Sequence, residues 1–83
     1  MKVDFRKIEV TLVDGSTQAI DISKELANLI YQNTREVSEA SFAMDLYKNG
    51  EVEVDEQLKE CVKKYAANFV YFVSAGIEKA LAE

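Results

Sequence analysis

Alternating apolar and polar residues near the N-terminus predict a β-hairpin. The apolar positions of this alternation are Ile8, Val10, Leu12, Ile20 and Ile22. A three-residue loop lets them share one face, whereas a two-residue loop would put the two apolar sets on opposite faces. We therefore expect a loop of residues 13–15 in which Gly15 adopts a positive φ. Val3 and Phe5 have the opposite parity, so the first strand either bends near Arg6 or begins after it.

Apolar residues at helical spacing predict two helices after the hairpin. The first helix has a buried face made of Leu26, Leu29, Ile30 and Val37. Ser23 can cap this helix, with Ile22 packing on its first turn, and the pattern breaks around residues 33–34. The second helix carries the apolar positions Ala40, Ala43, Met44, Leu46 and Tyr47. It should end at Asn49 and Gly50, because both residue types suit a left-handed C-cap.

The C-terminal segment predicts one long helix from Glu56 to about Ala82, with Asp55 as its cap. Its main apolar stripe consists of Leu58, Val62, Tyr65, Phe69, Phe72, Gly76 and Ala80. Four more apolar residues lie beside or opposite this stripe: Val70, Tyr71, Ile77 and Leu81. The apolar surface of this helix is therefore wider than one buried seam requires.

Together these patterns predict an α+β fold that forms a single domain over residues 1–83. An N-terminal β-hairpin is followed by three α-helices, and the long C-terminal helix packs on the hairpin. The stretch E-V-E-V at residues 51–54 is too short to decide between a loop and a small third strand.

The composition fits one small folded domain with a marginal core. Apolar residues make up 48% of the 83 positions, but a chain this short buries only about 60% of its unfolded surface. The lone Cys61 and the lack of His exclude an internal disulfide and a zinc site, and a single thiol fits a reducing cytoplasm. Oligomerisation is the remaining source of extra stability.

The charge and the longest uncharged run limit the classes of partner. A net charge of −5 with scattered basic residues argues against nucleic acid, which needs a clustered positive face. The uncharged run from Tyr65 to Ile77 has thirteen residues, fewer than the about 20 that a membrane-spanning helix needs. Charged residues such as Lys2 and Asp4 interrupt any signal peptide. We expect a soluble, cytoplasmic protein that binds neither nucleic acid nor membrane.

The residues of the chain do not indicate an enzyme or a cofactor. Without His, the usual general base of a nucleophile–base pair is missing. Cys61 lies beside the apolar stripe, where it is expected to be an inert small hydrophobe. The only glycines are Gly15, Gly50 and Gly76, so no glycine-rich phosphate loop is present.

Residues 45–56 match part of the spacing of a calcium-binding EF-hand loop. They place an acid at positions 1 and 12 and Gly50 at position 6. Position 3 is Tyr47, which cannot supply a carboxylate or amide oxygen. A simpler interpretation is that Asn49 and Gly50 end one helix and Asp55 caps the next. Calcium binding is therefore the less favoured interpretation, and no metal site is assigned.

Two segments resemble parts of small uncharacterised proteins encoded by bacterial prophages and related mobile elements. They are L-A-N-L-I-Y-Q-N-T at residues 26–34 and F-A-M-D-L-Y-K-N-G-E-V-E-V at residues 42–54. The resemblance covers less than half of the chain. It implies a bacterial cytoplasmic setting and no known activity, and it supplies no binding residues.

Two functional hypotheses follow. In the first, the protein is a non-enzymatic protein–protein interaction module that forms a homodimer through the C-terminal helix, with an interface of Val70, Tyr71, Ile77 and Leu81. A helix packed between two layers of a monomer explains the same apolar surface nearly as well. In the second, an acidic adaptor or inhibitor docks on a basic protein through Glu51, Glu53, Asp55, Glu56 and Glu60. Acids near a helix N-terminus are, however, already favoured by the helix dipole.

Overall fold

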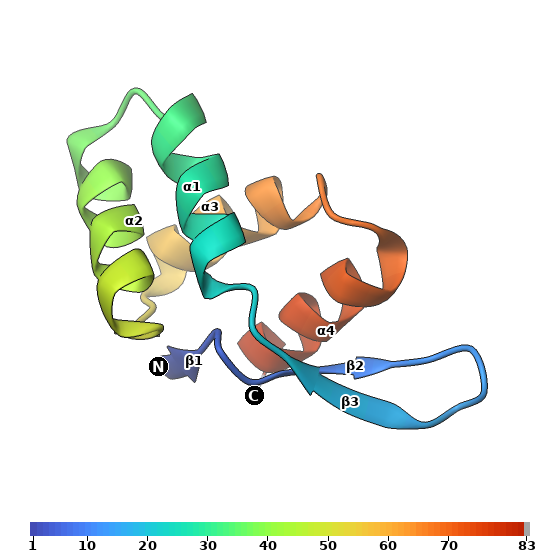
Figure 1. The fold of residues 1–83 in the computed structure, drawn as a ribbon. Coiled ribbons are helices and arrows are strands. Elements are labelled where there is room, and N and C mark those ends of the chain that lie inside the picture. Colours follow the sequence, from blue (N-terminus) through green and yellow to red (C-terminus); the bar gives the residue numbers. More distant parts are fainter. Residues whose placement is uncertain (83) are drawn as a thin grey trace.

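The computed structural model describes residues 1–82 and contains, in that range, four helices and four short strands (Figure 1). In chain order the elements are β1 (Lys2–Asp4), β2 (Ile8–Thr11), β3 (Thr17–Ile20), α1 (Ser23–Asn33), α2 (Val37–Asn49), β4 (Glu51–Glu53), α3 (Glu56–Ala66) and α4 (Tyr71–Ala82). The predicted order of one hairpin followed by three helices is wrong, because a strand lies between α2 and α3 and the last helix is divided. The protein is nevertheless a small α+β protein.

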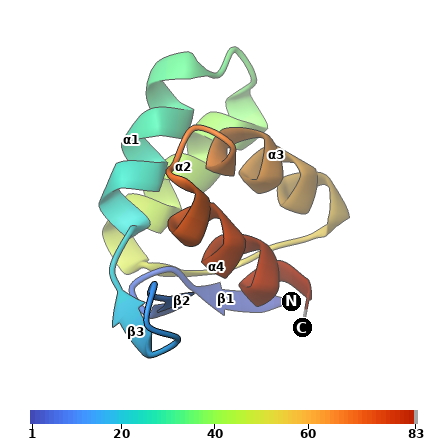
Figure 2. The ribbon, with the colours of Figure 1, turned by 90° about the vertical axis from the view of Figure 1, so that its right-hand side faces the viewer.

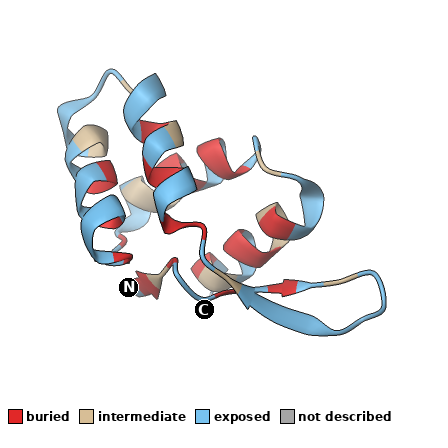
Figure 3. Cartoon of the chain, viewed as in Figure 1, coloured by how far each residue is buried: buried red, intermediate tan, exposed pale blue. Residues whose placement is uncertain are grey.

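The β2–β3 hairpin has the register and the loop that the alternation predicts. Ile8 lies opposite Ile20 in an antiparallel pair. The Leu12 N–H donates to the Ser16 carbonyl at 2.8 Å and closes a three-residue loop. In this loop Gly15 has a φ of 88°, a conformation that costs glycine little because it has no Cβ. The hairpin is a ribbon of two strands whose outer strand, β3, is largely exposed (Figure 3).

β1 pairs with β4 and forms a second two-stranded sheet. The chain turns directly after β1, where the Lys7 N–H donates to the Asp4 carbonyl at 3.2 Å. This turn explains the change of parity before the hairpin, since β1 is a separate strand with its own partner. Val3 lies opposite Val52, so the E-V-E-V stretch forms a strand because a segment distant in the sequence supplies its edge.

α1 and α2 run antiparallel and side by side (Figure 1). Ser23 is not the cap that we expected: its N–H and its hydroxyl both donate to Asp21 Oδ1, at 3.0 and 2.7 Å, so Asp21 fixes the turn into α1. α1 ends at Asn33, close to the predicted break. α2 is followed by Gly50 with a φ of 76°, which confirms the predicted C-cap. Val37 begins α2 and is exposed, so it is not part of the buried face of α1.

The C-terminal segment forms two helices, which corrects the prediction of one long helix. α3 packs against α1, whereas α4 packs against β2, so the two halves of the apolar stripe have different partners. At the end of α3 the Asn68 N–H donates to the Tyr65 carbonyl at 3.1 Å, and this tighter turn ends the helix. The break comprises residues 67–70, A-N-F-V, of which Asn68, Phe69 and Val70 have modest helix propensity. Interrupting the helix here therefore costs little.

The core lies where α4 meets the hairpin and where α1, α2 and α3 meet one another (Figures 2 and 3). Its largest fully buried side chains are Phe5, Ile8, Leu26, Ile30, Leu46, Ile77 and Leu81. Figure 2 shows α4 between the strands on one side and α1 and α3 on the other. It is thus α4 alone that packs on the hairpin. The molecule is elongated, with extents of 41 × 22 × 21 Å.

Candidate functional site

The connection into α4 and the loop of the β2–β3 hairpin form one exposed apolar surface. We call it the tip patch and define it as Val13, Val70, Tyr71 and Phe72. Tyr71 is 86% exposed and Phe72 is 42% exposed. A hollow of about 420 Å³ lies between the loop and α4, lined by Thr11, Leu12, Val13, Tyr71 and Phe72. Exposed aromatic side chains gathered in this way are typical of a surface that contacts another molecule.

Two contacts between α4 and β2 bring the halves of the tip patch together. A Cβ atom at Gly76 would lie 2.6 Å from the Glu9 carbonyl oxygen, so only glycine permits this approach. The Lys79 ammonium also bonds the Glu9 carboxylate at 2.9 Å. In the loop itself, Asp14 accepts hydrogen bonds from the hydroxyl and the N–H of Ser16, and the first of these lowers the pKa of Asp14. Asp14 is thus engaged by its own loop.

The four predicted interface residues divide into two pairs. Val70 and Tyr71 are exposed and belong to the tip patch. Ile77 and Leu81 are 0% and 2% exposed, because they lie on the side of α4 that is buried in the core of the same chain. These two residues cannot serve as an interface without unfolding α4, which corrects the predicted set.

Two members of the tip patch were not in the predicted interface. Phe72 lies on the main apolar stripe and would be buried in a continuous helix, but the break before α4 leaves it half-exposed. Val13 lies in the hairpin loop and is fully exposed. A β-branched apolar residue in a loop that otherwise carries Asp14 and Gly15 is the signal that could have identified it.

The predicted acidic surface is exposed, but three of its five members have partners within the chain. Asp55 accepts a hydrogen bond from the Leu58 N–H at 2.8 Å, which confirms it as the cap of α3. Glu53 accepts from the N-terminal amino group at 3.0 Å, and Glu56 lies 3.6 Å from the Lys59 ammonium. The remaining members are Glu51 and Glu60, which are exposed.

The segment that matched part of an EF-hand pattern is not a loop. Asp45 and Asn49 lie in α2, Glu51 to Glu53 form β4, and Glu56 begins α3. Within residues 1–82 there is no group of three or more acidic or thiol side chains that could hold a metal ion. The simpler interpretation, a helix end followed by a helix cap, describes this segment.

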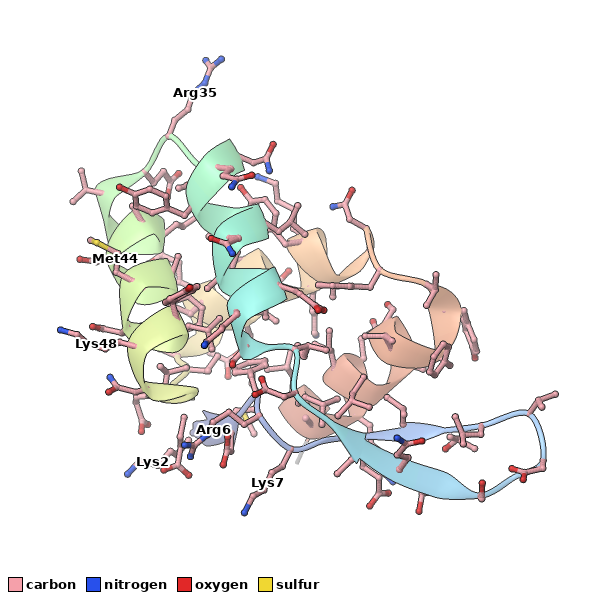
Figure 4. The ribbon with its side chains drawn as sticks, viewed as in Figure 1. Lys2, Arg6, Lys7, Arg35, Met44 and Lys48 are labelled. Atoms are coloured by element: carbon pink, nitrogen blue, oxygen red, sulfur yellow. The ribbon has the colours of Figure 1, made fainter. Side chains whose placement is uncertain are left out.

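A second apolar surface lies on α1 and α2, at the end of the molecule opposite to the hairpin loop (Figure 1). We call it the α1–α2 groove, a hollow of about 630 Å³ lined by Lys24, Ala27, Asn28, Tyr31, Ala43, Met44, Tyr47 and Lys48. Ala27 and Ala43 are buried at its base, whereas Tyr31 and Met44 are 55% and 54% exposed. Figure 4 shows Met44 and Lys48 projecting from α2 at this end of the molecule.

Met44 and Tyr47 are among the apolar positions that predict the second helix, and the structure places both on its exposed side. The buried side of α2 carries Ala43 and Leu46 instead. The Lys24 ammonium lies 5.5 Å from the centroid of the Tyr47 ring, within the range of a cation–π contact. A wide apolar surface on α2 was visible in the sequence, but its covered part depends on where α1 packs.

Cys61 is buried in the core. It is 4% exposed, and burial raises its pKa to about 12, with the Glu39 carboxylate adding to the rise. The thiol is therefore protonated at neutral pH, and a protonated thiol is a poor nucleophile. The burial of Cys61 agrees with its interpretation as a small core residue.

No protein-family model matches the chain, and the comparisons with curated proteins and with solved structures gave no match. The function of the protein is therefore inferred from the sequence and geometry of this chain. Among residues 1–82, no helix combines the length and the apolar character needed to cross a membrane.

Proposed function

We propose that the protein is a small non-enzymatic protein–protein interaction module that forms a homodimer through the tip patch. The observation that carries the proposal is the exposure of Val70, Tyr71 and Phe72 beside the hairpin loop. Cores of protein interfaces are enriched in aromatic residues and depleted of charged ones, and the tip patch has both properties. A surface without charge can face its own copy across a two-fold axis without repulsion.

The size of the domain supports a dimer. A single core in 83 residues gives marginal stability, and a partner that binds only the folded state adds to that stability. The tip patch lies at one end of a molecule 41 Å long, so pairing there would give an elongated dimer. The proposal includes no catalytic activity, because the only thiol is buried and protonated and the chain has no His.

Two further parts of the proposal concern the setting of the protein. The lone reduced thiol supports a cytoplasmic location. The resemblance of residues 26–34 and 42–54 to prophage and mobile-element proteins supports a bacterial mobile-element origin. Docking on a basic protein through the acidic surface has less support, because Glu53, Asp55 and Glu56 have partners within the chain.

Sedimentation equilibrium tests the dimer, with Tyr71→Glu as the disrupting variant. The wild-type chain should be dimeric at about 0.1 mM, and the variant should dissociate at least about tenfold more readily because it places a charge at the centre of the interface. The fold should persist, since the Tyr71 side chain is exposed. Tyr31→Glu, at the other end of the molecule, is the matched control and should leave the dimer unchanged.

Two outcomes would contradict the proposed dimer. One is a wild-type chain that remains a monomer up to about 1 mM, a concentration at which even a weak specific interface is populated. The other is a dimer that Tyr31→Glu dissociates as readily as Tyr71→Glu does. Small-angle scattering gives an independent check, because pairing at the tip patch should extend the particle well beyond 41 Å.

A further inference from the structure

The α1–α2 groove has the dimensions and lining of a site that binds a helix. Its lining residues on α1 run from Lys24 to Tyr31, about 10 Å of helix, with aromatic and Met side chains on the walls and alanines at the base. Two parallel or antiparallel helices with small residues between them leave a groove into which the ridge of a third helix can pack. Amphipathic helices are commonly recognised in such apolar grooves through side chains one and two turns apart.

The charges at the rim of the groove select the kind of helix. Lys24 of α1 and Lys48 of α2 both line the groove, and the Lys24 ammonium reaches across to the Tyr47 ring of α2, whereas the chain as a whole carries a net charge of −5. On α2 the acidic Asp45 points to a separate polar hollow that it lines with Glu51 and Glu53. The groove is thus a locally positive apolar surface on an acidic protein, and it is complementary to an apolar ridge flanked by acids.

A second copy of the chain is a poorer occupant of this groove. Pairing two grooves would place the four lysines of the two copies in one interface, and an interface with four like charges and no acid is unfavourable. Two lysines are also too few for the clustered positive face that a nucleic-acid backbone requires. We infer that the α1–α2 groove docks an acidic amphipathic helix of a partner protein, as a second binding site distinct from the tip patch.

The roles of the groove residues follow from their positions. Apolar side chains of the partner helix insert between Tyr31 and Met44, over the buried alanines. Acidic side chains beside that ridge pair with Lys24 and Lys48. The contact of Lys24 with the Tyr47 ring keeps its ammonium at the wall of the groove, so less ordering is required when the partner binds.

A pair of synthetic peptides tests the site directly. The acidic peptide has about 15 residues, enough for a marginal helix, with Leu at helical spacing, Glu on both flanks and one Trp; the basic peptide has Lys in place of Glu. The protein contains no Trp, so Trp fluorescence reports the peptide alone. The acidic peptide should bind saturably and more weakly as salt rises, and amide shifts in the protein should change at residues 24–31 and 43–48.

A charge exchange separates docking in the groove from general stickiness. Lys24→Glu combined with Lys48→Glu should lower the affinity for the acidic peptide about tenfold and raise the affinity for the basic peptide. Both charges at the rim of the groove change from positive to negative in this variant. Lys2→Glu combined with Lys7→Glu alters the net charge equally at two residues that do not line the groove, and it should change both affinities much less (Figure 4). Far-UV circular dichroism confirms that the variants stay folded.

Four results would overturn the inference. The acidic peptide could fail to saturate the protein, or it could shift amides of the tip patch instead of the groove. Equal affinity for the acidic and basic peptides would remove the role of the rim. Finally, the wild-type chain could sediment with phosphatidylglycerol vesicles while the Lys24→Glu, Lys48→Glu variant does not. That result would assign the groove to an anionic lipid surface instead.

Discussion

The tip patch and the α1–α2 groove are similar in residue types but different in construction. The groove is made by two consecutive helices, so its residues are close in the sequence. The tip patch joins the hairpin loop to the start of α4, two segments from opposite ends of the chain, and depends on the packing of α4 on β2. The tip patch should therefore be lost first when the fold is weakened, whereas the α1–α2 groove should persist.

The two surfaces also differ in charge, and this difference separates their proposed partners. The tip patch consists of uncharged side chains, which suits contact with an identical surface. The α1–α2 groove is lined by two lysines and no acid, which disfavours self-pairing and favours an acidic helix. Exposed apolar area alone would have assigned both surfaces the same role.

Replacement of Ile77 by Ala should give the largest effect. Ile77 is fully buried between α4 and the rest of the core, and deleting such a side chain leaves a cavity that costs about 2–5 kcal/mol of unfolding free energy. Urea unfolding followed by circular dichroism measures the loss. Tyr71→Ala on the same helix is the matched control, measured at a protein concentration low enough for the chain to be a monomer; it should then change stability by no more than about 0.5 kcal/mol, since Tyr71 is exposed in the monomer. Equal losses in the two variants would contradict the division of α4 into a buried and an exposed side.

Gly76→Ala tests the dependence of the tip patch on the contact between α4 and β2. The added methyl group would lie 2.6 Å from the Glu9 carbonyl oxygen, and the resulting strain should cost a net of about 1–3 kcal/mol in spite of the better helix propensity of Ala. Dimerisation should weaken in this variant, while binding of the acidic peptide to the α1–α2 groove should not change. Ser74→Ala on the same helix serves as the control. Unaltered stability of the Gly76→Ala chain would show that the helix moves away from β2 at no cost.

Acid should loosen the two regions through different carboxylates, and this is the smallest of the expected effects. Asp14 supports the hairpin loop and Asp21 the start of α1, and hydrogen bonds from Ser16 and Ser23 respectively lower their pKa values. A carboxyl whose pKa is lowered by folding contributes stability above its ordinary pKa of about 3.9 and loses it as the pH falls through the folded value.

Amide NMR shifts recorded from about pH 5 to about pH 2 measure this effect. Asp14→Asn should remove the acid-dependent changes in the hairpin loop and leave those at the start of α1, and Asp21→Asn should do the reverse. Loss of both sets of changes in either variant would indicate that the two regions respond to acid as one unit.

The loop of the hairpin, the end of α2 and the start of α3 were predictable because short-range geometry decides them. The parity of Ile8 and Ile20 fits a three-residue loop, and Gly15 and Gly50 take the positive φ values that the chain requires at those points. Asp55 caps α3 through a neighbour three residues away. Each of these features depends on residues within a few positions of one another.

The candidate sites were predictable only in part. Val70 and Tyr71 were singled out because they lie off the apolar stripe, and they are exposed. Ile77 and Leu81 were singled out for the same reason and are buried, because the break at residues 67–70 gives α4 an orientation independent of α3. The α1–α2 groove was missed, because the sequence pattern of the apolar positions on α2 is the same whether α1 covers all of them or only half.

The sequence by itself thus determined which residues of the hairpin share a face and where the chain turns at residues 13–15 and 49–50, because these features follow from the period of a strand and from local backbone geometry. Only the tertiary structure decided what covers each face. The β1–β4 pair, the break between α3 and α4, and the exposure of Tyr31 and Tyr71 all result from contacts between segments far apart in the chain. Such contacts are selected by the packing of the whole core, and a pattern within one segment carries no record of its partner.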